Sequence, residues 1–204
     1  MEDEKPSIYF EEKIKTSIFF QEYPFTFLGD IVDVEQSPKY HPEGSVWKHT
    51  MMVVDNAAQK KYKSKDSHVL MWAALLHDIG KAPTTVIRKG KITSYDHDKV
   101  GAEMAVEFLK QFTDDNSFIH NVSKLIRWHM QALFIVKGLP FADIGKMSEE
   151  VSVDEVALFT FCDRLGRGGM TPEKMEEEKR NVEVFTDKCR KYLSSKDKVL
   201  IEQR

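Results

Sequence analysis

Residues 73–81 read Ala-Ala-Leu-Leu-His-Asp-Ile-Gly-Lys, an apolar stretch that leads into two adjacent polar residues, His77 and Asp78. The apolar residues from position 69 onward recur at the three-to-four spacing of an α-helix, and their density predicts that this helix is buried. An imidazole and a carboxylate at the end of a buried helix offer two ligands for a divalent metal ion. The alternative is a solvated helix end, where the histidine complements the helix dipole.

The spacing of apolar residues predicts that most of the remaining chain is helical as well. Helical patterns cover about residues 45–60, 98–112, 116–133, 153–165 and 171–193. Asp66 or Ser67 can cap the central helix at its start, and Gly80 is a natural residue just beyond its end. Residues 84–95 lack the helical spacing and predict a short hairpin or loop. We therefore expect an all-α fold, a helical bundle with one small insert after the polar pair.

The start of the chain, residues 1–40, is expected to form an N-terminal helical extension ahead of a main domain over residues 41–204. Within this extension residues 7–22 are amphipathic, and Pro24 ends that run. The acidic first residues precede no apolar segment of a secretory signal. No apolar run approaches the ~20 residues that a membrane-spanning helix needs.

The composition is that of an ordinary soluble domain without a strong charge. The 204 residues include 33 acidic and 30 basic ones, which gives a net charge of −3. A nearly neutral chain argues against a long nucleic acid or an anionic membrane as its partner. The two cysteines, Cys162 and Cys189, form neither a disulfide framework nor a close metal-binding pair, so we expect a reducing, cytoplasmic location. The sequence leaves the oligomeric state open.

Two further polar residues lie on apolar helical stretches. His49 is on the helix that precedes the central one, and Asp163 ends the pattern over residues 153–165. Each has a structural interpretation, because His49 could be a hydrogen-bonded core residue and Asp163 could form a salt bridge with Arg164 or Arg167. A buried carboxylate is costly without a cation or hydrogen-bond donors, so Asp163 needs one of these partners.

Five sequence blocks follow one another along the chain. They are HPEGSVWKHT at residues 41–50, AALLHDIGK at residues 73–81, HDKVGA at residues 97–102, LIRWHM at residues 125–130 and DRLGR at residues 163–167. Together they resemble the HD-domain superfamily of metal-dependent phosphohydrolases, and most of all the HD domain of bacterial CCA-adding tRNA nucleotidyltransferases. The resemblance covers about residues 38–170. Residues 1–40 match no element of the nucleotidyltransferase head, so we expect a free-standing HD domain that does not extend tRNA.

The resemblance implies a metal centre built from the H…HD…D signature. Its ligands would be His49, His77, Asp78 and Asp163. Two imidazoles and two carboxylates suit a divalent ion such as Mn, Ni, Co, Fe, Mg or Zn. His97 and His129 match positions that hold a second metal in binuclear members; otherwise they would bind the phosphate or protonate the leaving group. We expect one tightly held ion with these two histidines lining the site, and a second ion as the alternative.

The resemblance also implies a set of catalytic residues around the ion. This set comprises Asp78, Lys81, His97, His129 and Arg167. Lys81 would reach a phosphate oxygen from the loop after the polar pair, and Arg167 is a similar candidate. Arg164 is expected to be structural.

The other basic residues and histidines have ordinary interpretations. The insert carries three basic residues that could form a rim attracting an anionic substrate, or simply an exposed hairpin. They are Arg88, Lys89 and Lys91. Three histidines are expected to be structural. They are His41, His68 and His120.

We therefore expect a metal-dependent phosphohydrolase that acts through a metal-activated water. Its substrate would be a phosphate mono- or diester of a nucleotide or related small molecule, with 2′,3′-cyclic phosphodiesters among the candidates. The expected partner is this small substrate, and neither a long nucleic acid nor a membrane. One alternative is a non-catalytic nucleotide-sensing or RNA-interacting module; another is a hydrolase of guanosine tetraphosphate-type alarmones.

Overall fold

Helices make up most of the chain, as the spacing of apolar residues predicts, and the expected all-α fold is confirmed. The structure is a computed structural model that describes the backbone of residues 4–202 and the side chains of residues 4–196. Its elements are α1 (Ser7–Thr16), the 3-10 helix η1 (Ile18–Gln21), α2 (Thr26–Gly29), α3 (Val46–Lys60), the 3-10 helix η2 (Lys61–Lys63), α4 (Ser67–Leu76), α5 (Lys81–Thr84), β1 (Thr85–Arg88), β2 (Lys91–Ser94), α6 (His97–Leu109), α7 (Asn116–Trp128), α8 (Gln131–Lys137), α9 (Ile144–Glu150), α10 (Val153–Leu165) and α11 (Pro172–Glu202).

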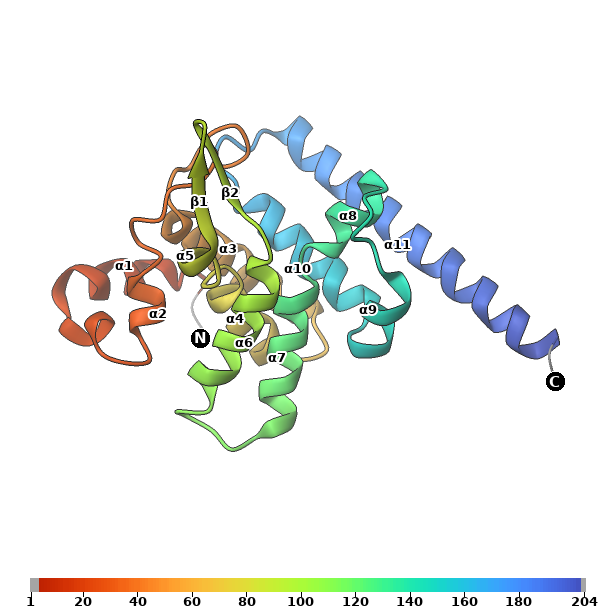
Figure 1. The fold of residues 1–204 in the computed structure, drawn as a ribbon, viewed down its shortest axis with the longest axis horizontal. Helices are drawn as coiled ribbons and strands as arrows, with labels where there is room; N and C mark the ends of the chain where they lie inside the picture. The colour runs from red at the N-terminus through yellow and green to blue at the C-terminus, as the bar shows by residue number, and fades with distance from the viewer. Residues whose placement is uncertain (1–3, 203–204) are drawn as a thin grey trace.

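Helix α4 lies at the centre of the bundle, between α3 and α7. Its start is fixed by Asp66, whose side chain accepts hydrogen bonds from the backbone N–H groups of His68 and Val69 at 2.9 and 3.1 Å. Most of its side chains are fully buried, so α4 is enclosed by its neighbours. Figure 1 shows α6 and α7 side by side, while α11 runs along α8 and α10 and extends past them.

Gly80 has a different role from the one that the sequence predicts. Helix α4 ends at Leu76, and Gly80 has a right-handed helical φ of −63°, so it is no left-handed cap. The reason for the glycine is close packing, because a Cβ at this position would lie 2.2 Å from the carbonyl oxygen of His97 and 2.5 Å from the backbone nitrogen of Gly101. This contact brings the end of α4 against the start of α6.

The predicted helix over residues 116–133 is two helices. Helix α7 ends at Trp128 and α8 begins at Gln131. The intervening His129 keeps a right-handed φ of −62°. Neither His129 nor Met130 is a glycine or a proline, so the apolar spacing contained no sign of the break. The short helix α9, capped by Asp143, also went unpredicted.

The N-terminal segment packs against the same core as the rest of the chain. Leu28 and Ile31 are fully buried, and the carbonyl oxygen of Ile31 accepts a hydrogen bond from the backbone N–H of Trp47 at 3.1 Å. The hydroxyl of Ser7 donates to Asp55 on α3 at 2.7 Å. These contacts tie the segment to α3; the domain boundary at residue 40 stays a prediction.

The predicted hairpin after the polar pair is confirmed. Strands β1 and β2 are antiparallel, with Val86 opposite Thr93 and Arg88 opposite Lys91. The two turn residues, Lys89 and Gly90, both have positive φ angles, of 50° and 72°. Such a two-residue turn matches the twist of the flanking strands. The hairpin projects from the helices in Figure 1.

None of the helices that the structure describes is both long enough and apolar enough to cross a membrane.

Candidate metal centre

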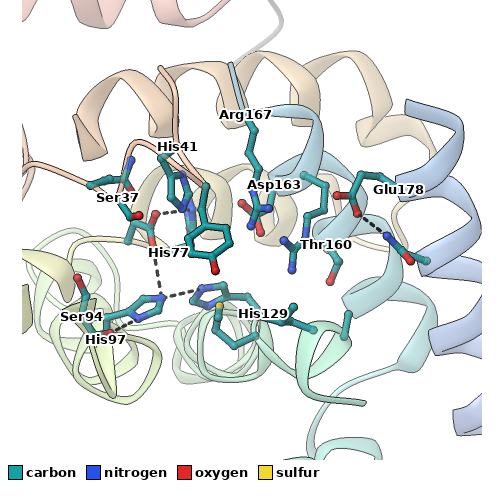
Figure 2. Close-up of a pocket in the computed structure, with 18 of the residues that line it drawn as sticks. Ser37, His41, His77, Ser94, His97, His129, Thr160, Asp163, Arg167 and Glu178 are labelled. Carbon is teal, nitrogen blue, oxygen red and sulfur yellow. Dashed lines mark hydrogen bonds and ion pairs between the residues drawn. The ribbon is translucent and has the colours of Figure 1, made fainter. Parts of the chain in front are cut away.

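Six polar side chains from five parts of the bundle converge on one buried point, which we call the ligand cluster. They are His49 from α3, His77 and Asp78 just after α4, His97 at the start of α6, His129 just after α7, and Asp163 near the end of α10. Every member is at most 8% exposed, so water does not screen their charges. Figure 2 shows four of them, with His77, His97 and His129 close together and Asp163 nearby.

Each histidine of the ligand cluster uses its Nδ1 atom to hold the ring in place. The Nδ1 atoms of His77, His97 and His129 donate to the carbonyl oxygens of the residue three positions earlier, at 3.0, 2.7 and 2.6 Å. A carbonyl oxygen only accepts hydrogen bonds, so these Nδ1 atoms carry the proton. His49 Nδ1 likewise faces the carbonyl oxygen of Gly166 at 3.2 Å. In a neutral imidazole, Nε2 is then left with a lone pair.

The four Nε2 atoms point toward one another and toward carboxylates. His77 Nε2 is buried and has no hydrogen-bond partner among the described residues. His97 Nε2 and His129 Nε2 are 3.2 Å apart, and His49 Nε2 lies 2.9 Å from Asp163 Oδ1. Acceptors this close repel unless a proton or a cation lies between them. The donor set of imidazole nitrogens and carboxylate oxygens therefore fits a divalent metal ion.

The carboxylate of Asp78 lies between two groups of histidines. Its Oδ2 atom is 3.1 Å from His77 Nε2 and 3.8 Å from His49 Nε2. Its Oδ1 atom is 3.6 Å from His97 Nε2. Asp78 consequently belongs to two possible ion positions, one with His49 and His77 and one with His97 and His129.

The pKa values of these residues reflect the charge of the site. Burial alone would lower the pKa of His49, but its hydrogen bonds to Asp163 and Glu43 raise it to about 9. Burial and the neighbouring histidines lower the pKa of His129 to about 3. Burial would raise the pKa of Asp78, yet the positive charges around it hold that pKa well below its usual range. The carboxylates therefore favour the protonated, positively charged form of His49, whereas burial keeps His129 neutral.

Lys81 is neither solvated nor free in the loop. Its ammonium donates to Asp78 Oδ2 and to Gln36 Oε1, both at 2.7 Å, and the residue is only 8% exposed. These two contacts hold the Asp78 carboxylate in position. A third N–H of the ammonium remains for another acceptor.

One residue that the sequence interpretation missed, Glu43, lies beside His49. The buried carboxylate of Glu43 lies 2.9 Å from His49 Nδ1 and 2.8 Å from His41 Nδ1, and it accepts a hydrogen bond from the Gly168 N–H at 2.9 Å. Burial would raise the pKa of Glu43, but these hydrogen bonds lower it strongly. Glu43 therefore stays ionised and orients His49, as outer carboxylates do for metal-ligating histidines. The Glu in the block at residues 41–50 was the available signal.

The structural alternative for Asp163, a salt bridge with Arg164 or Arg167, does not form among the described residues. Asp163 pairs with His49 instead. Arg164 is 8% exposed and forms no hydrogen bond or ion pair with a described residue, and the Arg167 Nε atom is buried without a partner. Burial, and then the charge of Arg167, lowers the pKa of Arg164. We call these two residues the arginine pair.

A cavity of about 530 Å³ opens over the ligand cluster and the arginine pair. This volume is typical of a small-molecule site. Polar groups of the cluster line one end, and apolar side chains of α8 and the hairpin line another part. The apolar residues include Ile92, Met130, Leu133 and Val136. In Figure 2 Arg167 points toward Asp163, and Glu178 of α11 closes the opposite side.

The basic residues of the insert and the remaining histidines lie mostly apart from this cavity. Of the residues that line it, none is Arg88, Lys89 or Lys91, although Ile92 and Ser94 of the same hairpin are included. His68 and His120 are exposed on the surface. His41 lines the cavity and forms a hydrogen bond with Glu43 at 2.8 Å; the structural role expected of it stays a prediction.

Comparison with known proteins identifies similar sequences. The sequence model of the HD domain family matches residues 46–180. The Multifunctional CCA protein of Azoarcus sp. (strain BH72) is 29% identical over 154 residues, which cover 72% of this chain and 35% of that protein. The Multifunctional CCA protein of Actinobacillus pleuropneumoniae serotype 5b (strain L20) is 32% identical over 122 residues, or 56% of this chain and 28% of that protein. The chain thus spans about a third of the length of these curated relatives.

Proposed function

The chain belongs to the HD domain family, and from that premise we propose that it is a metal-dependent phosphohydrolase. In the proposed reaction water adds to phosphorus, the ester P–O bond breaks, and the leaving oxygen takes a proton. The substrate would be a phosphate ester of a nucleotide or a related small molecule. The observation that carries this proposal is the convergence of the Nε2 atoms of four buried imidazoles beside two buried carboxylates.

The cation of the proposed enzyme would be divalent. Its ligands would be His49, His77, Asp78 and Asp163. When bound, such an ion lowers the pKa of a water molecule and neutralises charge that develops on a phosphoryl oxygen. Mn, Ni, Co, Fe, Mg and Zn are all compatible with nitrogen and oxygen donors, and availability in the cell decides among them.

Neighbouring side chains orient the proposed metal ligands. Lys81 holds Asp78 through its hydrogen bond at 2.7 Å, and Glu43 holds His49 through Nδ1. A site whose ligands are already oriented loses less freedom when substrate binds. Arg167 would place its positive charge beside the phosphate, since it points into the cavity near Asp163 (Figure 2).

The leaving oxygen needs a proton, and His97 and His129 are the nearest candidates to supply it. Their Nε2 atoms are 3.2 Å apart, so they could take up the proton that the attacking water releases and pass it to the leaving oxygen. In this role they would act as a general acid. The competing role is to hold a second ion with Asp78 Oδ1, which lies 3.6 Å from His97 Nε2. We propose one tightly held ion, with the second position filled only at high metal concentration.

The test is an assay of the purified full-length chain with each divalent ion against a panel of phosphate mono- and diesters of nucleotides. We expect turnover that requires a metal and that disappears in the variants His77→Ala and Asp78→Ala. The control is His120→Ala, because His120 is exposed and lies outside the cavity. Turnover that persists in the His77→Ala variant would contradict the proposal. Tight binding of a nucleotide that stays intact with every metal would favour a sensing module.

A further inference from the structure

Arg164 is a buried charge without a partner among the described residues. It is only 8% exposed, and its position on α10 places it in the wall of the cavity. The two carboxylates whose charges act on it each contact another residue. Asp163 Oδ1 contacts His49 Nε2 at 2.9 Å, and Glu178 Oε2 accepts a hydrogen bond from Asn181 at 3.1 Å.

An unpaired buried guanidinium is costly, and native proteins retain one where it binds something. The cost is greater here because Arg167 lines the same cavity, and the Nε atom of Arg167 is buried without a partner among the described residues. Two like charges that share a low-polarity cavity repel each other. An anion with two negative charges would offset both the burial and the repulsion.

Other basic groups of the cavity cannot supply the same pair of contacts. Lys81 already donates to Asp78 and to Gln36, each at 2.7 Å. Lys137, at the end of α8, is exposed to solvent. The arginine pair therefore offers donors that no described residue uses, in a wall that also carries the carboxylates of Asp163, Glu177 and Glu178. Guanidinium groups present their donors in a planar fork that matches phosphate oxygens.

We propose that Arg164 and Arg167 together bind the terminal, doubly charged phosphate group of a phosphate monoester, and thereby select monoesters over diesters. This inference rests on the proposed function and narrows its substrate class. A monoester has a second pKa near 6 and carries close to two negative charges at neutral pH, whereas a diester carries one. The remaining volume of the cavity, with its apolar wall of Met130, Leu133 and Val136, would hold the organic part of the ester.

The first experiment measures binding without turnover. The melting temperature of the full-length chain is followed while inorganic phosphate is titrated, for the wild type and for Arg164→Met, Arg164→Lys and Arg180→Gln. Arg180 is the matched control, because it is an exposed arginine on α11 outside the cavity. We expect phosphate to stabilise the wild type and the control equally. We expect Arg164→Met to weaken the apparent phosphate affinity roughly 10- to 100-fold, with Arg164→Lys in between.

The melting temperature without phosphate separates a binding role from a structural one. Removing an unpaired buried charge should leave the melting temperature of Arg164→Met unchanged or higher. A strong loss of stability in both Arg164 variants, together with an unchanged phosphate effect, would overturn the proposal. An unchanged phosphate effect in a stable Arg164→Met variant would overturn it as well.

The second experiment measures substrate selection, with p-nitrophenyl phosphate and bis(p-nitrophenyl) phosphate as probes. We expect the wild type to prefer the monoester, and Arg164→Met to raise KM for the monoester far more than for the diester. A parallel fall for both substrates would overturn the selection of monoesters. If no metal supports turnover but Arg164→Met abolishes the phosphate effect on stability, the arginine site stands and the hydrolase proposal fails.

Discussion

On one side of the cavity every histidine of the ligand cluster is fixed by a hydrogen bond to the protein, whereas on the other side the arginine pair has no such partner among the described residues. Lys81 and Arg164 are the clearest contrast, because both are cations that are 8% exposed. Lys81 has two acceptors at 2.7 Å, and Arg164 has none in the described part of the chain. Side chains whose hydrogen bonds are made within the fold form a site that exists before any ligand binds. Buried side chains that lack hydrogen-bond partners indicate where a ligand binds.

The largest expected effect comes from breaking the ligand cluster itself. The double variant His77→Ala, Asp78→Ala removes Asp78, which belongs to both possible ion positions, and His77, which belongs to the position with His49. We expect it to lose bound metal and to lower any phosphoester turnover by about 10³-fold or more, since the remaining groups cannot hold the ion. Elemental analysis and the ester panel measure both effects. One equivalent of metal retained by this variant would contradict the assignment.

Removing an outer partner tests whether the ligand cluster depends on its hydrogen bonds. In Glu43→Gln the His49 Nδ1 atom loses a charged acceptor at 2.9 Å, while the size of the side chain is kept. We expect metal affinity to fall by about 10- to 100-fold, the usual cost of losing such a partner. A competition titration with a metal-binding dye measures the change. An unchanged affinity would show that the Gly166 carbonyl oxygen alone orients the ring.

The pH dependence of stability tests the buried state of His129 in chain freed of metal. Its pKa is lowered to about 3 in the folded protein, whereas an unfolded chain has the ordinary value near 6.5. Between these two values the unfolded chain binds more protons, so stability falls as the pH falls. We expect wild type to lose about 1.4 kcal/mol per pH unit relative to His129→Gln across this window.

Urea unfolding with a chelator present at several pH values gives the free energies for this comparison. A variant that is as acid-sensitive as the wild type would show that His129 is not kept neutral by burial.

The smallest effect is expected at the cysteines, which lie in the core behind the cavity. Burial raises the pKa of Cys162 to about 12 and that of Cys189 to about 11. At pH 8 only about one Cys162 side chain in 10⁴ would be a thiolate, so reaction with a thiol reagent should be very slow. We expect negligible labelling of the native chain and two labelled thiols after denaturation, measured by mass spectrometry. Rapid native labelling of Cys162 would show that α10 is less tightly packed than its contacts indicate.

Much of the fold could be predicted from apolar spacing and capping residues. Asp66 caps α4 as expected, and the hairpin after the polar pair lies where the sequence places it. The break between α7 and α8 could not be predicted, because His129 and Met130 are ordinary helix residues and the break depends on tertiary packing. Gly80 was assigned to a helix cap, since close approach between two backbones leaves no local sequence signal.

The residues of the candidate site could be predicted from the sequence, but the contacts between them could not. The sequence blocks contained all six residues that the structure brings together in the ligand cluster. Their order along the chain does not show which of their neighbours are paired. The sequence therefore left a salt bridge of Asp163 with Arg164 or Arg167 open as an alternative, whereas in the structure that carboxylate contacts His49. Pairing depends on side-chain direction, which is fixed only when the helices pack.

The contact between Gly80 and Gly101 has a consequence for the dimensions of the cluster. Main-chain atoms of the two segments touch there, and a methyl group at position 80 would meet the His97 carbonyl oxygen at 2.2 Å. The distance between Asp78 and His97 therefore depends on a residue without a side chain at position 80. A larger residue there would increase this distance without changing any donor atom, and the ionic radius would then decide which cations still bind.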